Sequence, residues 1–172
     1  MKATPPEITE AFSEAVIYVF ERALNSKIDM SLARIDGKED LFCSAISCVG
    51  EETLSFILSF EANSAMAITE AYFGLALALD SPDLKDAIGE LVNVVAGYAV
   101  ENLEKVDILT EMSLPLFAHS VDELQTDGKM IGCTLYKVKD IAFDLRIYPG
   151  RVARTSLPGK KPYDASEQSQ PV

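Results

Sequence analysis

The sequence of 172 residues has few of the groups from which most enzyme active sites are built. It holds a single histidine, His119, and three cysteines that form no C-x-x-C pair. One histidine excludes multi-histidine metal sites, and we interpret His119 as structural because it lies in a strand-like run. Glycine-rich nucleotide loops and the G-x-S-x-G motif of hydrolases are missing as well. These absences argue against the common cofactor-dependent enzymes and serine hydrolases.

Long apolar runs are also missing. The most apolar stretch, residues 91–100, is too short to span a bilayer and contains Asn93. Residues 1–10 carry two glutamates and two prolines where a signal peptide would have an apolar core. We interpret the cysteines as small buried side chains in a reducing compartment. The sequence therefore predicts a cytoplasmic protein that does not enter a membrane.

Basic residues are scarce, since 15 Lys and Arg stand against 27 Asp and Glu and leave a net charge of −12. Nucleic acids and anionic membrane surfaces are bound through basic residues, so neither is an expected partner. The charge is uneven along the chain. Residues 1–124 hold 22 acidic and 7 basic residues, whereas residues 125–172 hold 5 acidic and 8 basic residues. The basic excess of the second part has no evident role.

Apolar residues make up 48% of the chain, and their spacing predicts its elements. Intervals of three and four predict long helices over residues 6–24 and 82–104, with a short helix between them that ends at Gly74. Ser81 before Pro82 is typical of a helix start. Apolar and alternating runs predict strands over residues 27–35, 41–49, 53–60, 112–119, 129–138 and 141–148.

One order repeats in this prediction, because a long helix followed by three strands occurs twice. The order favours a single α+β domain over residues 1–149, in which the two long helices pack on a β-sheet assembled from both halves. Residues 150–172 are polar and rich in proline, and their composition predicts an extended or disordered tail.

The second long helix has two faces of different character. Its polar residues fall within an arc of roughly 80° on a helical wheel. They are Asp86, Glu90, Asn93, Gly97 and Glu101. The opposite side is apolar, which predicts that the helix packs on the core. The ordinary explanation of the polar side is a face covered by water.

Two residues of this polar face favour a different explanation. Asn93 is a poor helix former in mid-helix, and Gly97 costs about 1 kcal/mol relative to alanine at such a position. A bare glycine beside an amide and a carboxylate lets another molecule approach closely. Packing against a second helix would also explain Gly97, although its position on the polar side weakens that explanation. The residues thus favour a docking face.

The stretch 86–97, DAIGELVNVVAG, resembles the signature of the CheX/CheC/FliY family of bacterial chemotaxis phosphatases. That signature is Asp or Ser, three residues, Glu, two residues, Asn, about twenty-one residues and Pro. Asp86, Glu90, Asn93 and Pro115 stand at these positions. The resemblance extends over residues 6–149 and includes the repeat of a helix and three strands. It implies the two-repeat fold of the family, with a docking or active helix in the second half.

The first long helix lacks the signature. Ala11 and Glu14 stand opposite Glu90 and Asn93 when the two helices are aligned with an offset of 79 residues. An offset of 78 gives Phe12 and Ala15, so neither alignment restores a Glu/Asn pair. Family members have one or two active helices, and this chain therefore resembles the CheX-like branch with one.

The resemblance implies a substrate, which is a phosphorylated CheY-like receiver domain carrying an aspartyl-phosphate. Asn93 would hold the attacking water, and Glu90 would pair with a lysine of the receiver. The required Mg²⁺ would belong to the receiver, so this chain is expected to bind no cofactor or metal. For Asp86 two roles stay open, orientation of the site or a favourable interaction with the helix N-terminus. Pro115 is expected to shape the chain beside the active helix.

A non-catalytic module with the same fold is the alternative, either one that binds a receiver without turnover or one that dimerises. The intact set of Glu, Asn and Pro favours the enzyme. The family resemblance also implies a homodimer with exchanged strands. The predicted strand 129–138 carries apolar residues that would suit such a contact. They are Ile131, Cys133 and Leu135.

Overall fold

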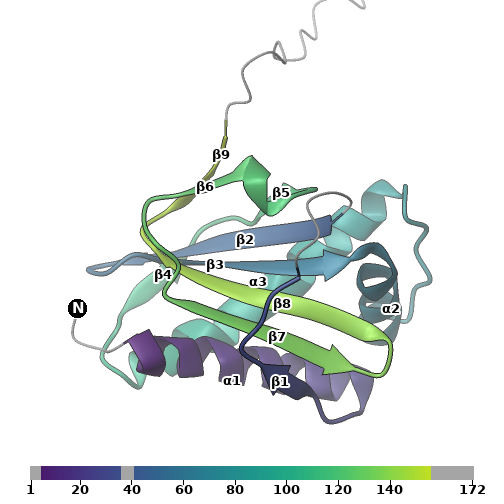
Figure 1. Ribbon diagram of the computed structural model, residues 1–172, viewed down its shortest axis with the longest axis horizontal. Coiled ribbons are helices and arrows are strands. Elements are labelled where there is room, and N and C mark those ends of the chain that lie inside the picture. The colour runs from purple at the N-terminus through teal and green to yellow at the C-terminus, as the bar shows by residue number, and fades with distance from the viewer. Residues whose placement is uncertain (1–4, 36–40, 156–172) are drawn as a thin grey trace, which may run out of the picture.

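The structure is a computed structural model that describes residues 5–35 and 41–155 (Figure 1). Its helices are α1 (Pro5–Leu24), α2 (Ala62–Phe73), α3 (Pro82–Glu104) and the single 3-10 turn η1 (Val121–Glu123). The strands are β1 (Asp29–Ser31), β2 (Leu41–Gly50), β3 (Leu54–Glu61), β4 (Thr110–Met112), β5 (Leu116–Ala118), β6 (Leu124–Thr126), β7 (Gly132–Val138), β8 (Ile141–Pro149) and β9 (Val152–Arg154). In these two ranges, no helix combines the length and the hydropathy needed to cross a membrane.

The main sheet has the strand order β1-β7-β8-β3-β2-β4, and β5 pairs with β2 beside β4. The first strand of each half therefore pairs with a strand of the other half, since β1 pairs with β7 and β4 pairs with β2. The central pair β3–β8 joins the halves along seven residue pairs. This exchange confirms the predicted α+β fold of two helix-and-strand repeats that share one sheet.

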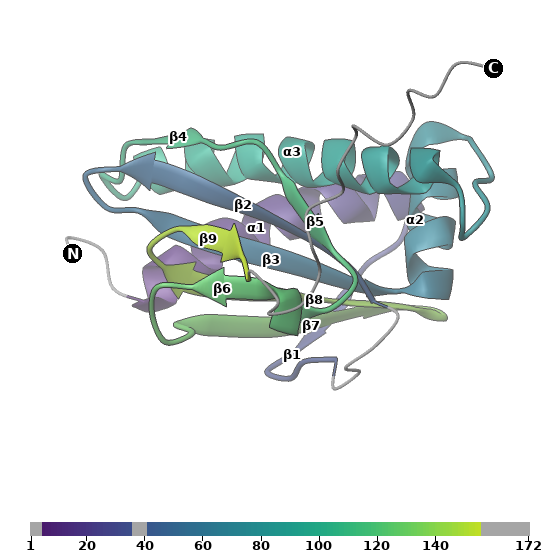
Figure 2. The same cartoon turned by 90° about the horizontal axis from the view of Figure 1, so that it is seen from above.

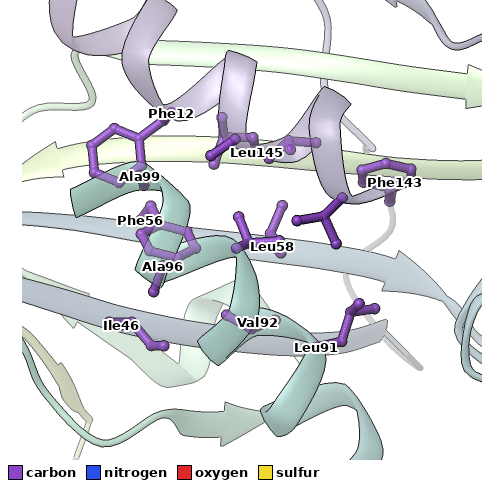
Figure 3. Packing of buried hydrophobic residues seen from close by; sticks show 14 of the residues in the cluster. Phe12, Ile46, Phe56, Leu58, Leu91, Val92, Ala96, Ala99, Phe143 and Leu145 are labelled. Atoms are coloured by element: carbon purple, nitrogen blue, oxygen red, sulfur yellow. The ribbon is translucent and has the colours of Figure 1, made fainter. Parts of the chain in front are cut away.

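The two long helices α1 and α3 run along one face of the sheet, and α2 closes one end (Figure 2). Their apolar stripes form the main core with the strands. In Figure 3, Phe12 of α1 and Val92, Ala96 and Ala99 of α3 lie in the layer between helices and sheet, and all are buried. Stacked rings of Phe20 and Phe143, with centroids 4.3 Å apart, continue this core. The packing of α3 leaves its predicted polar side facing away from the sheet.

The opposite face of the sheet carries a smaller core. Alternate residues of β2, such as Cys43 and Ala45, point to this side, where Leu124 and Val152 of the small β6–β9 sheet cover them. The first residues of the predicted tail therefore belong to the fold, because β9 pairs with β6 and buries Val152. Residues 156–172, the remainder of the predicted tail, lie outside the described residues.

Two predicted strands differ from the structure. The expected half-buried strand over residues 27–35 is only the three-residue β1, and all three of its residues are exposed. Among the described strands β1 is at the edge of the sheet and pairs only with β7, and the side chains of Met30 and Leu32 remain 53% and 94% exposed. The expected extended piece over residues 112–119 is broken into β4 and β5 on either side of Pro115.

Candidate functional site

The helix α3 begins where the sequence predicts. Ser81 is its N-cap, and the Ser81 side chain accepts a hydrogen bond from the backbone N–H of Asp83 at 3.2 Å, with Pro82 in the first turn. The buried stripe of α3 then fixes the rotation of the helix against the sheet. Consequently Asp86 and Glu90 are exposed, and Asn93 is half-buried. The predicted polar face is therefore open along the helix.

Glu90 and Asn93 stand three residues apart, so their side chains project from neighbouring positions on one face. Neither side chain has a hydrogen-bond or ion-pair partner among residues 5–35 and 41–155. A carboxylate and an amide without partners in this part of the chain are available to one incoming molecule at the same time. The structure brings both predicted residues to one accessible place.

Gly97 is not required by packing among the described residues. A Cβ added at Gly97 would meet no atom within 4 Å. The contacts between α3 and α1 lie beside this position, where Asn102 donates from Nδ2 to the carbonyl of Ala11 at 3.0 Å and the rings of Tyr18 and Tyr98 lie 4.5 Å apart. Packing of Gly97 against α1 does not explain the glycine, and its use in docking stays a prediction.

Pro115 reaches the site from a distant part of the chain. Its Cγ lies 3.7 Å from the position that a Cβ on Gly89 would take, and Gly89 stands directly before Glu90 in α3. The neighbouring strand β5 is held in place by its pairing with β2. Pro115 therefore lies directly beside α3, and its role in shaping the chain there stays a prediction.

A groove of about 460 Å³ extends from Glu90 toward the N-terminus of α3. The helix contributes Lys85, Asp86, Gly89 and Glu90 to its walls, and the other walls come from strands and the Pro115 segment: Ser44, Pro115, Phe117 and Arg154. Of these lining residues, Asp86, Glu90 and Pro115 were predicted from the sequence as site residues, and Lys85 and Gly89 of α3 were not. Three further lining residues outside α3 were not predicted either: Ser44, Phe117 and Arg154. No local pattern marks those three residues, because β2, β5 and β9 meet α3 only through the tertiary fold.

Another charged cluster in the described chain is structural. Asp144 and Arg146 of β8 form a buried ion pair at 2.8 Å between Oδ2 and Nη2. The Asp144 carboxylate also accepts from the backbone N–H of Ile35 at 2.8 Å, while Arg146 donates to the Ile35 carbonyl at 2.9 Å. These groups fasten the segment after β1 to the sheet. Within residues 5–35 and 41–155, no three His, Cys, Asp or Glu side chains gather closely enough to hold a metal ion.

The fold and the signature on α3 define the class of protein. The sequence model of the family described as chemotaxis phosphatase CheX matches residues 42–134, which is more than half of the chain and includes Asp86, Glu90, Asn93 and Pro115. The chain belongs to this CheX family. No curated protein matches the chain significantly.

Solved structures of chemotaxis proteins share the fold. A CheC-like superfamily protein from Shewanella sp. PV-4 matches with a TM-score of 0.70 at 16% identity, covering 84% of this chain and 98% of its own. CheX from Vibrio vulnificus matches with a TM-score of 0.67 at 14% identity, covering 83% and 98%. The CheX–CheY–BeF3–Mg²⁺ complex from Borrelia burgdorferi matches with 0.65 at 15% identity, covering 83% and 97%. These similarities extend over nearly the whole length of each relative.

Proposed function

We propose that this protein is a phosphatase that removes the phosphoryl group from the aspartyl-phosphate of a CheY-like receiver domain in chemotaxis or a related two-component pathway. The observation that carries the proposal is the pair Glu90 and Asn93, open on α3 and without partners among the described residues of a CheX-family chain. The Borrelia burgdorferi relative, solved with CheY, BeF3 and Mg²⁺, supports a receiver as the partner.

In the proposed mechanism Asn93 positions water. The side-chain amide offers a donor and an acceptor on one planar group, so it can hold a water molecule in line with the phosphorus atom. An amide is too weak a base to take the proton, and Asn93 therefore contributes orientation alone. Phosphoryl transfer depends mainly on positioning and electrostatics. A hundredfold acceleration requires only about 2.7 kcal/mol of transition-state stabilisation, which an oriented water can supply.

Glu90 docks the receiver in this mechanism by pairing its carboxylate with a receiver lysine. The exposed Asp86, one turn earlier, adds negative charge on the same side of α3. The open space above Gly97 allows the receiver backbone to approach the helix. Pro115 holds the segment beside Gly89 and so fixes the edge of the docking surface.

The proposal assigns no cofactor to this chain, because the Mg²⁺ needed for the reaction would be held by the receiver. We also propose a cytoplasmic location, and the three free cysteines fit a reducing compartment. A homodimer is proposed as well, since β1 covers only residues 135–137 of β7 at that edge of the sheet. Light scattering at micromolar concentration should give the mass of two chains, and the mass of one chain would contradict the dimer.

The test of the proposal is an assay of acyl-phosphate loss. A panel of purified CheY-like receivers is phosphorylated with acetyl phosphate, and the loss of the aspartyl-phosphate is followed with and without this protein. At least one receiver should lose its phosphoryl group faster in its presence. Binding of a phosphorylated receiver without any acceleration would favour the non-catalytic module.

Glu90→Ala should weaken productive docking in the same assay, with a rise in KM larger than the fall in kcat. Glu70→Ala is the matched control and should keep the wild-type KM, because Glu70 is an exposed carboxylate on α2, outside the polar face of α3. Equal KM and kcat for Glu90→Ala and the wild type would remove Glu90 from the mechanism.

A further inference from the structure

Two cations of the groove beside Glu90 are held by one residue, Phe117 of β5. The Nζ atom of Lys85 lies 5.2 Å from the centroid of the Phe117 ring, at cation–π distance. The guanidinium of Arg154 donates from Nη2 to the backbone carbonyl of Phe117. Because β5 is paired with β2, Phe117 is a fixed support, and it holds both positive charges on the strand side of the groove.

Ser44 lies in the same groove and is directly opposite Phe117 in the pairing of β2 with β5. Its side chain is fully buried, and its Oγ has no hydrogen-bond partner within the described ranges of the chain. A buried hydroxyl without a partner is unfavourable, and most such groups in native proteins have one. A ligand atom that enters the groove and accepts a hydrogen bond would satisfy Ser44.

The acidic and the basic side chains of the groove lie on opposite sides of it. Asp86 and Glu90 lie on the helix side, whereas Lys85 and Arg154 are tied to Phe117 on the strand side. Neither acidic residue is paired with either basic residue in the described structure. The groove therefore complements a surface on which a positive and a negative group stand next to each other.

We propose that Lys85, Arg154 and Ser44 form an anion subsite that receives an acidic side chain of the receiver, next to the lysine that Glu90 binds. This inference rests on the proposed function and extends it by a second docking contact. Arg154 then acts as a specificity residue that selects receivers with a carboxylate at the matching position. It also gives a role to one of the basic residues that follow Gly150.

A protein side chain fits this subsite better than free phosphate does. The two carboxylates that line the groove repel a small anion that arrives alone. A receiver brings its lysine at the same time, and that lysine neutralises Glu90 while its acidic neighbour meets Arg154. Paired charges of opposite sign on two surfaces favour one partner and one register of docking.

The test compares variants of Arg154 in binding to the receiver selected by the dephosphorylation assay, activated with beryllofluoride and Mg²⁺. Arg154→Glu should raise the Kd in isothermal titration about tenfold, with KM rising in parallel and kcat changing by less than about twofold. Arg154→Gln, which keeps a donor for the Phe117 carbonyl, should give an intermediate Kd. Arg151→Glu is the matched control. It changes the charge by the same amount just before β9, and Arg151 is not among the residues that line the groove.

Ser44→Ala distinguishes an effect on receiver binding from an effect on stability. Removal of the unpaired hydroxyl should leave the Tm unchanged or higher, while receiver affinity falls about threefold because one hydrogen bond is lost.

A wild-type Kd for Arg154→Glu, in an assay where Asn93→Ala still abolishes turnover, would overturn the subsite and leave the proposed function intact. Inorganic phosphate is titrated separately by NMR. Phosphate binding that depends on Arg154, together with a wild-type receiver Kd for Arg154→Glu, would show a small-anion site and overturn the proposal.

Discussion

Two asparagines of α3 differ in how the fold uses them. Asn102 donates to the Ala11 carbonyl at 3.0 Å and accepts from Nζ of Lys105 at 2.7 Å, so it joins α3 to α1. Asn93, nine residues earlier, makes no side-chain hydrogen bond within the described chain. An asparagine within a helix lowers helix propensity, and Asn102, in the last turn of α3, offsets this by a tertiary contact. Asn93 has no such compensation, which is the expected state of a residue kept for another molecule.

Two buried thiols and one buried phenol make the free energy of unfolding depend on pH in the alkaline range. Burial raises the pKa of Cys43 to about 11, of Cys48 to about 12 and of Tyr136 to about 12. In the unfolded chain the pKa is about 8.5 for cysteine and about 10 for tyrosine. The folded state therefore holds protons that the unfolded state releases, and this stabilisation is complete below about pH 8.5 and is lost as the pH rises toward 12.

We therefore expect the free energy of unfolding to fall steadily between about pH 9 and pH 11, measured by urea denaturation. Cys48→Ala should make this slope shallower, because one buried thiol no longer contributes. The comparison uses slopes, so the loss of packing in the variant at every pH does not affect it. A free energy of unfolding that stays level over this range would contradict the role of these groups.

At the scale of elements, α3 could be predicted almost completely. Its cap at Ser81, its apolar stripe and its end near Glu104 are all local signals, and the structure confirms each of them. The edge strands β1 and β9 could not be predicted in the same way, because three-residue strands exist only through the partners that β7 and β6 provide. The groove could not be predicted from the sequence for the same reason, since Arg154 reaches it only once β9 has formed.

Gly97 offers a test of why α3 carries a glycine on its polar face. Gly97→Ala should raise the free energy of unfolding by about 0.5–1 kcal/mol, because alanine favours the helix and the added methyl meets open space. The same change should weaken receiver binding, since the methyl group stands where the partner approaches. Urea denaturation and titration with the activated receiver measure the two effects separately.

A destabilised Gly97→Ala variant would show that the fold itself requires the glycine. A variant with greater stability and unchanged receiver affinity would remove Gly97 from the docking face. Only a gain in stability together with a loss of affinity agrees with the account.

At the scale of the whole molecule, the two halves share one architecture and differ in chemistry. Each half supplies a long helix and exchanges its first strand with the other, yet only α3 carries the Glu and Asn pair, because α1 has Ala11 and Glu14 or Phe12 and Ala15 at the corresponding positions. Ala11, Phe12 and Ala15 are buried in the core, so three of these four positions of α1 serve packing. The two halves therefore share a fold, and the proposed activity belongs only to the half that contains α3.

The net charge of −12 belongs mainly to residues 1–124, which include α3. The acidic excess of this part of the chain should steer the protein toward the exposed lysine of a receiver, and salt screens such steering. The association rate constant in stopped-flow measurements should fall about tenfold or more between low and high ionic strength. The dissociation rate should change much less, and an association rate that does not depend on salt would contradict steering.

If Asn93 orients the attacking water, its loss must slow the single-turnover loss of the aspartyl-phosphate, measured with this protein in saturating excess over the phosphorylated receiver. Asn93→Ala should return the rate to that of the receiver alone, a loss of about 100-fold if the wild type accelerates by that factor, with the receiver Kd within about threefold of wild type. Asn63→Ala is the matched control, an exposed asparagine in α2, and should keep the full rate. Full acceleration by Asn93→Ala would contradict the account.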